Sequence, residues 1–123
     1  MVYKNLQNKI KNGSITTLVY RGLKCLIIRF SSIGDIVLTT PVIRCLKKKH
    51  PESEIHYLTK NNFAGIVESN PNVTKVHRLK NDLRETIEQI KNEKFDHIID
   101  LHHNIRTLQI KRALKKIPFH SFN

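Results

Sequence analysis

Residues 26–41 read LIIRFSSIGDIVLTTP, and this stretch decides how the rest of the sequence is interpreted. A continuous apolar run ends abruptly in two serines, a glycine and an aspartate, and a helical pattern follows. This pattern is typical of a buried parallel strand that breaks at its carboxyl end and leads into a helix. Because ligands of open α/β sheets bind at the carboxyl ends of the strands, residues 31–35 are the candidate site.

The alternation of strand and helix patterns continues along the chain. Strands are predicted over residues 24–30, 54–59, 73–79 and 95–101, with a fifth beginning near Pro118; helices are predicted over 35–49, 61–69, 82–93 and 105–114. This order predicts an α/β fold, a Rossmann-like parallel sheet with strand order 3-2-1-4-5 and helices on both faces. The first and fourth strands are then neighbours, which places residues 31–35 beside residues 100–106.

The helix predicted over residues 35–49 carries two local expectations. Leu38, Val42, Cys45 and Leu46 follow helical spacing and are expected to share its apolar face. Pro41 interrupts the pattern, so we expect either a short turn before it or a kink at it.

Composition places the chain among ordinary globular proteins. It has 123 residues, of which 39% are hydrophobic and 26% charged, enough for one domain with a real core. No apolar run approaches the roughly 18–20 residues that span a bilayer, and the start lacks a secretory signal, so a cytoplasmic protein is expected. Cys25 and Cys45 have neither metal spacing nor disulfide density and are expected to be buried free thiols.

The net charge is +12, which favours anionic partners, although a solvated basic surface explains it equally. Residues 1–23 contain four cations and no acid, and we interpret them as a basic N-terminal extension, either a loosely attached tail or a contact with a membrane surface. Residues 24–123 then form the domain. The sequence stops where a fifth strand should form, which suggests a truncated polypeptide.

The residues around the first strand end have a physical logic of their own. A dinucleotide site is excluded, because it needs three glycines at fixed spacing and the loop after the first strand has only Gly34. Gly34 would permit a sharp turn, and Ser31, Ser32 and the helix amides would offer hydrogen bonds to a phosphate or a sugar hydroxyl. Asp35 can take a proton from an attacking hydroxyl, or it can simply cap the helix, and composition and spacing leave both roles open.

Three stretches together resemble one family. Residues 29–37, RFSSIGDIV, resemble the opening motif of the lipopolysaccharide heptosyltransferases, glycosyltransferase family nine. Residues 95–107, FDHIIDLHHNIRT, resemble that family's second signature, in which a strand ends in Asp and polar and basic residues follow. The turn NPNV at residues 70–73 also fits. The resemblance covers residues 24–123.

The resemblance implies the N-terminal, acceptor-side half of a GT-B enzyme, in which two Rossmann-like domains face a cleft. Asp35 would be the general base of an inverting transfer from an ADP-heptose-like donor to a lipopolysaccharide core, an anionic glycolipid, near the inner membrane. No metal or other cofactor is implied. The C-terminal nucleotide-binding domain is missing from this sequence, so the chain alone is expected to be inactive.

Further polar residues follow the predicted strand ends. We assign Lys60, Lys80, Arg84 and Arg106 to acceptor binding, with ordinary surface cations as the alternative. His102 and Asn104 are expected to hydrogen-bond the acceptor, or His102 to bond Asp100. Asp100, assigned to the same site, is expected to hold the two loops together. His102 and His103 are adjacent on an extended chain and point apart, so no metal site is expected there.

Two rival interpretations remain. The chain can be a non-catalytic basic module that binds an anionic glycolipid or a nucleic acid, or the inert product of a truncated gene. Of these two partners, nucleic acid is the less supported, because the chain has only eight Tyr and Phe residues, no Trp and no aromatic-plus-basic recognition motif.

Overall fold

A five-stranded parallel sheet forms the centre of the molecule in a computed structural model, which describes residues 23–121. The strands lie in the order β3-β2-β1-β4-β5, and each neighbouring pair is parallel. Their bounds are β1 Lys24–Ile28, β2 Glu54–Thr59, β3 Lys75–Arg78, β4 His97–Asp100 and β5 Phe119–Ser121. The predicted strand order and the parallel α/β fold are therefore confirmed.

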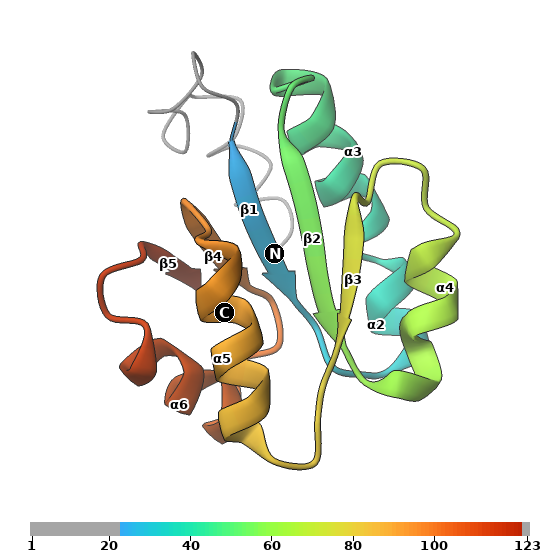
Figure 1. The fold of residues 1–123 in the computed structure, drawn as a ribbon. Coiled ribbons are helices and arrows are strands. Elements are labelled where there is room, and N and C mark those ends of the chain that lie inside the picture. Colours follow the sequence, from blue (N-terminus) through green and yellow to red (C-terminus); the bar gives the residue numbers. More distant parts are fainter. Residues whose placement is uncertain (1–22, 122–123) are drawn as a thin grey trace.

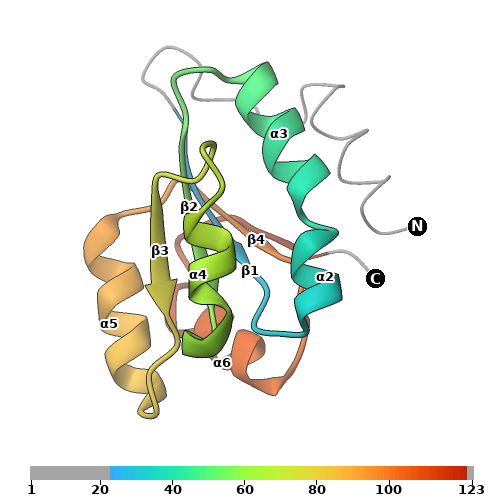
Figure 2. The ribbon, with the colours of Figure 1, turned by 90° about the vertical axis from the view of Figure 1, so that its right-hand side faces the viewer.

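Helices cover both faces of this sheet (Figures 1 and 2). The helices α2, α3 and α4 lie on one face, and α5 and α6 lie on the other. Their bounds are α2 Ile33–Val37, α3 Thr40–Lys49, a short 3-10 helix η2 Asn61–Phe63, α4 Ala64–Glu68, α5 Leu83–Glu93 and α6 Ile105–Ala113.

Two hydrophobic clusters hold the helices to the sheet, and β1 supplies both. Cys25 and Ile27 point into the cluster under α2 and α3, while Leu26 and Ile28 point into the cluster under α5 and α6. All four side chains are fully buried. Alternation along a strand sends neighbouring residues to opposite faces, so a strand covered on both sides needs apolar residues throughout.

The prediction for Pro41 is confirmed in its first form. The helical segment divides into α2 and α3, and Pro41 lies in the first turn of α3. Proline suits this position because its missing N–H would have no partner inside the helix. Asp82 caps α5, as the sequence indicates, by accepting a hydrogen bond from the amide of Arg84 at 3.0 Å.

Some expectations fail in detail. Leu38 lies between the two helices with 56% of its surface exposed, so it does not share the apolar face of Val42 and Leu46. Cys45 is half-buried, whereas Cys25 is buried and its desolvation raises the pKa of its thiol to about 12. The strand β2 has its predicted bounds, whereas β1, β3 and β4 are shorter than predicted, because the ends of those apolar runs serve as loops.

The predicted N-terminal extension falls almost wholly outside the described residues, with the exception of Leu23, which is buried. Among residues 23–121, no helix has the length and hydropathy that crossing a bilayer requires.

The contrast between Leu46 and Leu38 gives a matched test of this packing. Leu46→Ala removes a fully buried side chain and should lower the free energy of unfolding by about 2–5 kcal/mol. Leu38→Ala should change it by less than about 0.5 kcal/mol, because the side chain is mostly exposed. Urea-induced unfolding followed by circular dichroism measures both. Equal losses in the two variants would contradict the packing described here.

Candidate functional site

Two loops meet at the carboxyl ends of β1 and β4. The first, residues 29–32, is called the β1 loop below, and the second, residues 101–104, the β4 loop. The two strands are paired, with Ile28 opposite Asp100. The loops that follow them therefore begin next to each other at the carboxyl edge of the sheet. The sequence-based placement of these segments side by side is confirmed.

Arg29 joins the two loops. One guanidinium nitrogen, Nη1, donates to the carbonyl oxygen of Leu101 at 2.6 Å, and the other, Nη2, lies 2.9 Å from Oδ2 of Asp35. The side chain is 19% exposed, so these contacts are partly shielded from solvent. A second link runs from the amide of Phe30 to Nδ1 of His102 at 3.3 Å. Sequence analysis assigned Arg29 no role, although it is the one cation that directly ends the apolar run of β1.

Asp35 is held at one oxygen and open at the other. Its Oδ2 accepts from the hydroxyl of Ser32 at 2.9 Å and from the amide of Ser32 at 3.4 Å, and it is the oxygen that pairs with Arg29. Among the described residues no hydrogen bond or ion pair reaches Oδ1. The side chain is 43% exposed at the carboxyl edge of the sheet.

The surroundings of Asp35 favour its ionised form. The hydroxyl of Ser32, then the amide of Ser32 and then the charge of Arg29 hold the pKa of this carboxyl below its usual range. Asp35 is therefore a carboxylate at neutral pH and a weaker proton acceptor than an ordinary aspartate. The helix-capping role that the sequence left open is present in the structure, in the form of a contact back to the residue before α2.

Gly34 has no local reason to be glycine. It lies inside α2, and a Cβ added to it would meet no atom within 4 Å. The expectation that this position needs glycine for a sharp turn is wrong. Ser31 lies beside it at the edge of the loop and is partly exposed, and its hydroxyl makes no hydrogen bond within residues 23–121.

The side chains of Asp100, which ends β4, and of Asn104 in the β4 loop bond to nearby backbone amides. Oδ1 of Asp100 accepts from the amides of His102 and His103, each at 2.9 Å, and the residue is only 4% exposed. Asn104 caps α6 through a reciprocal pair of hydrogen bonds with Thr107, at 3.0 and 2.8 Å. Asp100 thus shapes its own loop. The expectation that it links the two loops is wrong, because Arg29 and His102 make that link.

Positive charge gathers around His102. The guanidinium of Arg106 lies 5.1 Å from the ring centre of Phe30, whose ring in turn lies 4.7 Å from that of His102. Burial lowers the pKa of His102, and the charges of Arg29, Arg106 and Lys60 lower it further, against the opposing effect of Asp100. His102 is therefore neutral at pH 7, and three cations lie close enough to influence it.

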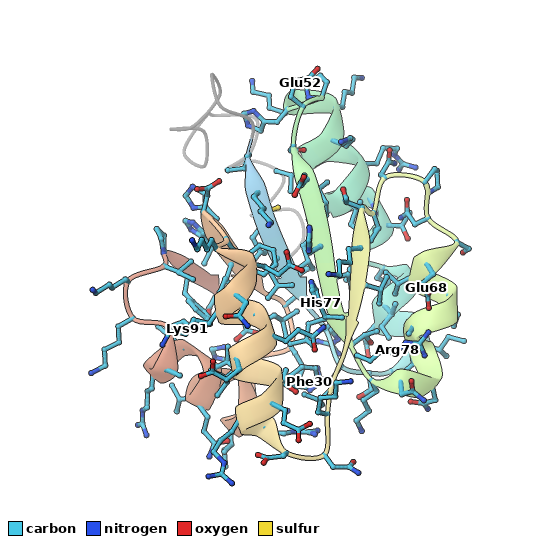
Figure 3. The ribbon with its side chains drawn as sticks, in the orientation of Figure 1. Phe30, Glu52, Glu68, His77, Arg78 and Lys91 are labelled. Atoms are coloured by element: carbon cyan, nitrogen blue, oxygen red, sulfur yellow. The ribbon has the colours of Figure 1, made fainter. Side chains whose placement is uncertain are left out.

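The other two predicted cations lie farther along the same edge. Lys80 and Arg84 follow β3, the edge strand, and Arg84 is 91% exposed beside Asp82. No hydrogen bond or ion pair within residues 23–121 joins either of them to the β1 or β4 loop. Arg78, at the end of β3, is engaged elsewhere, with Glu68 at 2.6 Å and Asn61 at 2.7 Å (Figure 3).

The described residues form two cavities of about 410 Å³, and the second of them is lined in part by the β4 loop. One lies between α2, α3 and α4 and is lined by Thr39, Arg44 and Tyr57 among others. At its floor the hydroxyls of Thr39 and Tyr57 lie 2.9 Å apart. The second lies beside the β4 loop, between β5 and α6, and includes Asp100, Asn104 and Lys111. No sequence motif marks the first cavity, because its walls are side chains of three helices, one strand and a turn between residues 36 and 72 that packing brings together.

Comparison with known proteins gives a consistent family likeness. The lipopolysaccharide heptosyltransferase 1 of Campylobacter coli is 29% identical over 104 residues, which is 79% of this chain and 30% of that protein. The crystal structure of a family 9 glycosyltransferase from Veillonella parvula matches 80% of this chain and 32% of that one, with a TM-score of 0.67 and 27% identity. The Escherichia coli ADP-heptose lps heptosyltransferase II matches with a TM-score of 0.71 over 80% and 30% of the two chains; at 17% identity this likeness shows the fold alone. No protein-family model matches the chain.

The chain thus spans about 30% of the length of the curated relative it matches. It is distantly homologous to part of the lipopolysaccharide heptosyltransferases of glycosyltransferase family 9, and its sheet matches one part of their GT-B structure.

The contacts of Asp35 can be tested with the two neighbouring serines. Ser32→Ala removes the hydroxyl that contributes most to the lowered pKa, so the pKa of Asp35 should rise. Ser31→Ala should leave it unchanged, because Ser31 does not contact the carboxylate. A pH titration of the side-chain carboxyl carbon by NMR measures both. A rise of the same size in both variants would contradict the assigned geometry.

Proposed function

We propose that this chain is the acceptor-binding part of an inverting glycosyltransferase that moves a heptose-like sugar from an ADP-linked donor to a lipopolysaccharide core. The premise is its distant homology to part of the family 9 glycosyltransferases. The single observation that carries the proposal is the partly exposed Asp35 carboxylate, fixed through Oδ2 at the junction of the β1 and β4 loops, with no contact to Oδ1 among the described residues.

The proposed step uses Oδ1 of Asp35 as the proton acceptor. The acceptor hydroxyl gives its proton to Oδ1, its oxygen forms a bond to the anomeric carbon, and the bond from that carbon to the donor diphosphate breaks. ADP departs with the electron pair, and attack from the opposite side inverts the anomeric centre. A general base must be deprotonated before the reaction, and the contacts of Ser32 and Arg29 keep Asp35 in that form.

The same contacts weaken the base, and the acceptor supplies the compensation in this proposal. When an anionic sugar binds beside Arg29, its charge competes with Asp35 for the guanidinium, which raises the basicity of the carboxylate. The proton transfer would therefore become favourable only with the acceptor in place. A site of this kind is activated by its own substrate.

The cations around His102 are the proposed acceptor contacts. Lys60 and Arg106 lie nearest the joined loops, and a core sugar that carries phosphates or carboxylates would pair with them. Ser31, His102 and Asn104 would contact its hydroxyls. We place Lys80 and Arg84 at the outer end of the same surface, where they would meet a more distant charge on the glycolipid.

The donor is held elsewhere in this proposal. About two-thirds of the length of the matched relative lies outside the likeness, and we assign the diphosphate-binding groups to that part. The chain alone would then bind acceptor and not transfer sugar. Transfer would take place on the cytoplasmic side of the inner membrane, where a glycolipid acceptor is anchored, with no metal required.

The proposed role of Asp35 can be tested in a chimera in which this chain replaces the matching part of the Campylobacter coli enzyme. Asp35→Asn should lower the rate of transfer from ADP-heptose by about 10²–10⁴-fold, as loss of a general base does. Asp82→Asn is the matched control, because Asp82 also caps a helix beside an arginine but lies away from the joined loops. It should leave the rate at saturating acceptor unchanged, because its partner Arg84 is assigned to acceptor binding and not to proton transfer. Equal rates in the chimera and in its Asp35→Asn variant would contradict the catalytic role.

Gly34→Ala separates ligand contact from stability. Alanine is favoured over glycine inside a helix by about 0.5–1 kcal/mol, and nothing in the chain blocks a methyl group there. The variant should unfold at the same or a higher urea concentration. If the acceptor sugar lies against residues 31–35, the candidate site, the same variant should raise the acceptor KM of the chimera. An unchanged KM would remove Gly34 from the binding surface.

Acceptor binding by the 123-residue chain tests the cation assignments directly. Lys60→Ala and Arg106→Ala should each weaken binding of a fluorescent lipopolysaccharide-core oligosaccharide by about five- to tenfold, equivalent to about 1 kcal/mol. Lys91→Ala, an exposed lysine on α5, should change it by less than about twofold (Figure 3). If the chain binds duplex DNA and not the oligosaccharide, and the affinity falls steeply with salt, the result would favour the alternative that the chain is a nucleic-acid-binding module.

A further inference from the structure

Three side chains that commonly bind metals meet under α5, near the amino ends of β1 and β2. They are His56 on β2, His77 on β3 and Glu93 at the end of α5, and one ligand atom from each lies within 4.8 Å of the other two. His56 and His77 are 3% and 1% exposed, and the Glu93 side chain is 18% exposed. Figure 3 places His77 inside the molecule, between the sheet and α5.

The two rings form part of a continuous polar chain. The amide nitrogen of Gln89 lies 2.8 Å from Nδ1 of His77, Nε2 of His77 lies 2.9 Å from Nδ1 of His56, and Nε2 of His56 lies 3.5 Å from a carboxylate oxygen of Glu54. One set of tautomers satisfies every contact, with each group donating to the next toward Glu54. Burial lowers the pKa of His77 to about 4 and also that of His56, so both rings are neutral at pH 7.

We propose that His56, His77 and Glu93 bind one Zn²⁺ ion through Nδ1 of His56, Nε2 of His77 and a carboxylate oxygen of Glu93. Zn–N bonds of about 2.0 Å with tetrahedral angles place ligand atoms about 3.3 Å apart. The separation of 2.9 Å between the two ring nitrogens and of 3.7 Å between Nε2 of His77 and Oε2 of Glu93 lie on either side of that value. The third pair, one ligand atom of His56 and one of Glu93, lies within 4.8 Å, so the Glu93 carboxylate would move toward the two rings when a zinc ion binds.

The groups behind the ligands are already arranged to support it. With Zn²⁺ on Nδ1, His56 keeps its proton on Nε2 and directs it to Glu54, a carboxylate–histidine contact that orients and strengthens the ligand. His77 moves its proton to Nδ1, and a rotation of the Gln89 amide turns its oxygen toward that proton. Only one tautomer change and one amide rotation are needed.

Two carboxylates lie beside the histidines, and two lysine ammonium groups compete with a metal ion for Glu93. Glu93 currently pairs with Lys75 at 2.7 Å and with Lys24 at 3.1 Å. The Lys75 side chain is 55% exposed and can swing into solvent, which frees Oε2 for the metal. Glu54 and Glu93 together supply two negative charges, and Lys24, which lies 3.9 Å from Glu54 and 3.1 Å from Glu93, stays as a positive charge beside them. Imidazole with a single carboxylate is a donor set suited to zinc and poorly suited to Mg²⁺ or Ca²⁺.

A metal at this point would add a link between β2, β3 and α5 to the strand pairing and side-chain contacts that already join them. β3 is the four-residue edge strand and pairs only with β2, while α5 ends beside it at Glu93. Zinc would tie the end of α5 to both strands. The site lies away from the β1 and β4 loops, so it is independent of the proposed sugar transfer.

The test is a titration of the EDTA-treated 123-residue chain with ZnCl₂. Isothermal calorimetry should give one site per chain, and the thermal midpoint should rise by more than about 5 °C at a hundredfold excess over Kd. MgCl₂ should produce no shift. Co²⁺ in place of Zn²⁺ should give the visible absorption of a four-coordinate nitrogen and oxygen site. No zinc-dependent change in the wild-type chain overturns the proposal and leaves the polar chain as a purely structural network.

Variants locate the ion. His77→Gln should abolish binding, and Glu93→Gln should weaken it by more than about tenfold. Lys75→Met should tighten it, because it removes the ammonium that competes for Oε2. This variant keeps the buried ligands intact, so it decides the question even if His77→Gln does not fold.

The matched control is the second histidine pair of the sheet. Nδ1 of His97 lies 3.0 Å from Nε2 of His120 on β4 and β5, but the described residues place no third ligand there that completes a cluster. His97→Gln should bind zinc as the wild-type chain does. Loss of binding in His97→Gln, or unchanged binding in a folded His77→Gln, would overturn the assignment.

Discussion

The arrangement at the carboxyl edge depends on the guanidinium of Arg29. It lies where β1 ends, between the Leu101 carbonyl of the neighbouring loop and the Asp35 carboxylate that follows in its own chain. A planar group with several fixed donors can serve two acceptors at once, which a lysine ammonium at the same place could not do with the same geometry. The parallel pairing of β1 and β4 brings the two loops together, and this side chain fixes how they meet.

The same interaction sets the chemical character of Asp35. Ser32 and Arg29 occupy one carboxylate oxygen and keep the group ionised, which serves both helix capping and any role in proton transfer. The two roles that the sequence leaves open are therefore compatible, because the carboxylate has two oxygens and residues 23–121 contact only one of them. What separates a cap from a base here is whether a hydroxyl can reach Oδ1, and the exposure of the side chain permits that approach.

The histidines show how one sheet uses its two ends differently. His102 lies among cations at the carboxyl edge, where its ring packs against Phe30 and accepts from the backbone. His56 and His77 lie beneath α5, beside a carboxylate and inside a closed polar chain. All three are neutral through burial, but only the second environment adds the anionic third ligand that a metal needs.

The sequence alone determined the layout of the chain. The unbroken apolar run of β1 indicated a strand covered on both faces, Pro41 and Asp82 marked helix starts, and the repeated strand–helix order led to the 3-2-1-4-5 sheet. It also placed the β1 and β4 loops together, since neighbouring parallel strands end at the same edge. These features are local or topological, so periodicity and turn chemistry are sufficient to derive them.

Only the tertiary structure decided what the individual side chains do. The Asp100 side chain accepts hydrogen bonds from amides of the loop that follows it, and Leu38 lies between two helices. Arg29 contacts residues 6 and 72 positions away along the chain. The cluster of His56, His77 and Glu93 was equally invisible, because its members come from three elements and share no motif. Hydrogen bonds and ligand sets depend on distances of a few tenths of an ångström, and those distances are set by packing between segments that a linear pattern does not relate.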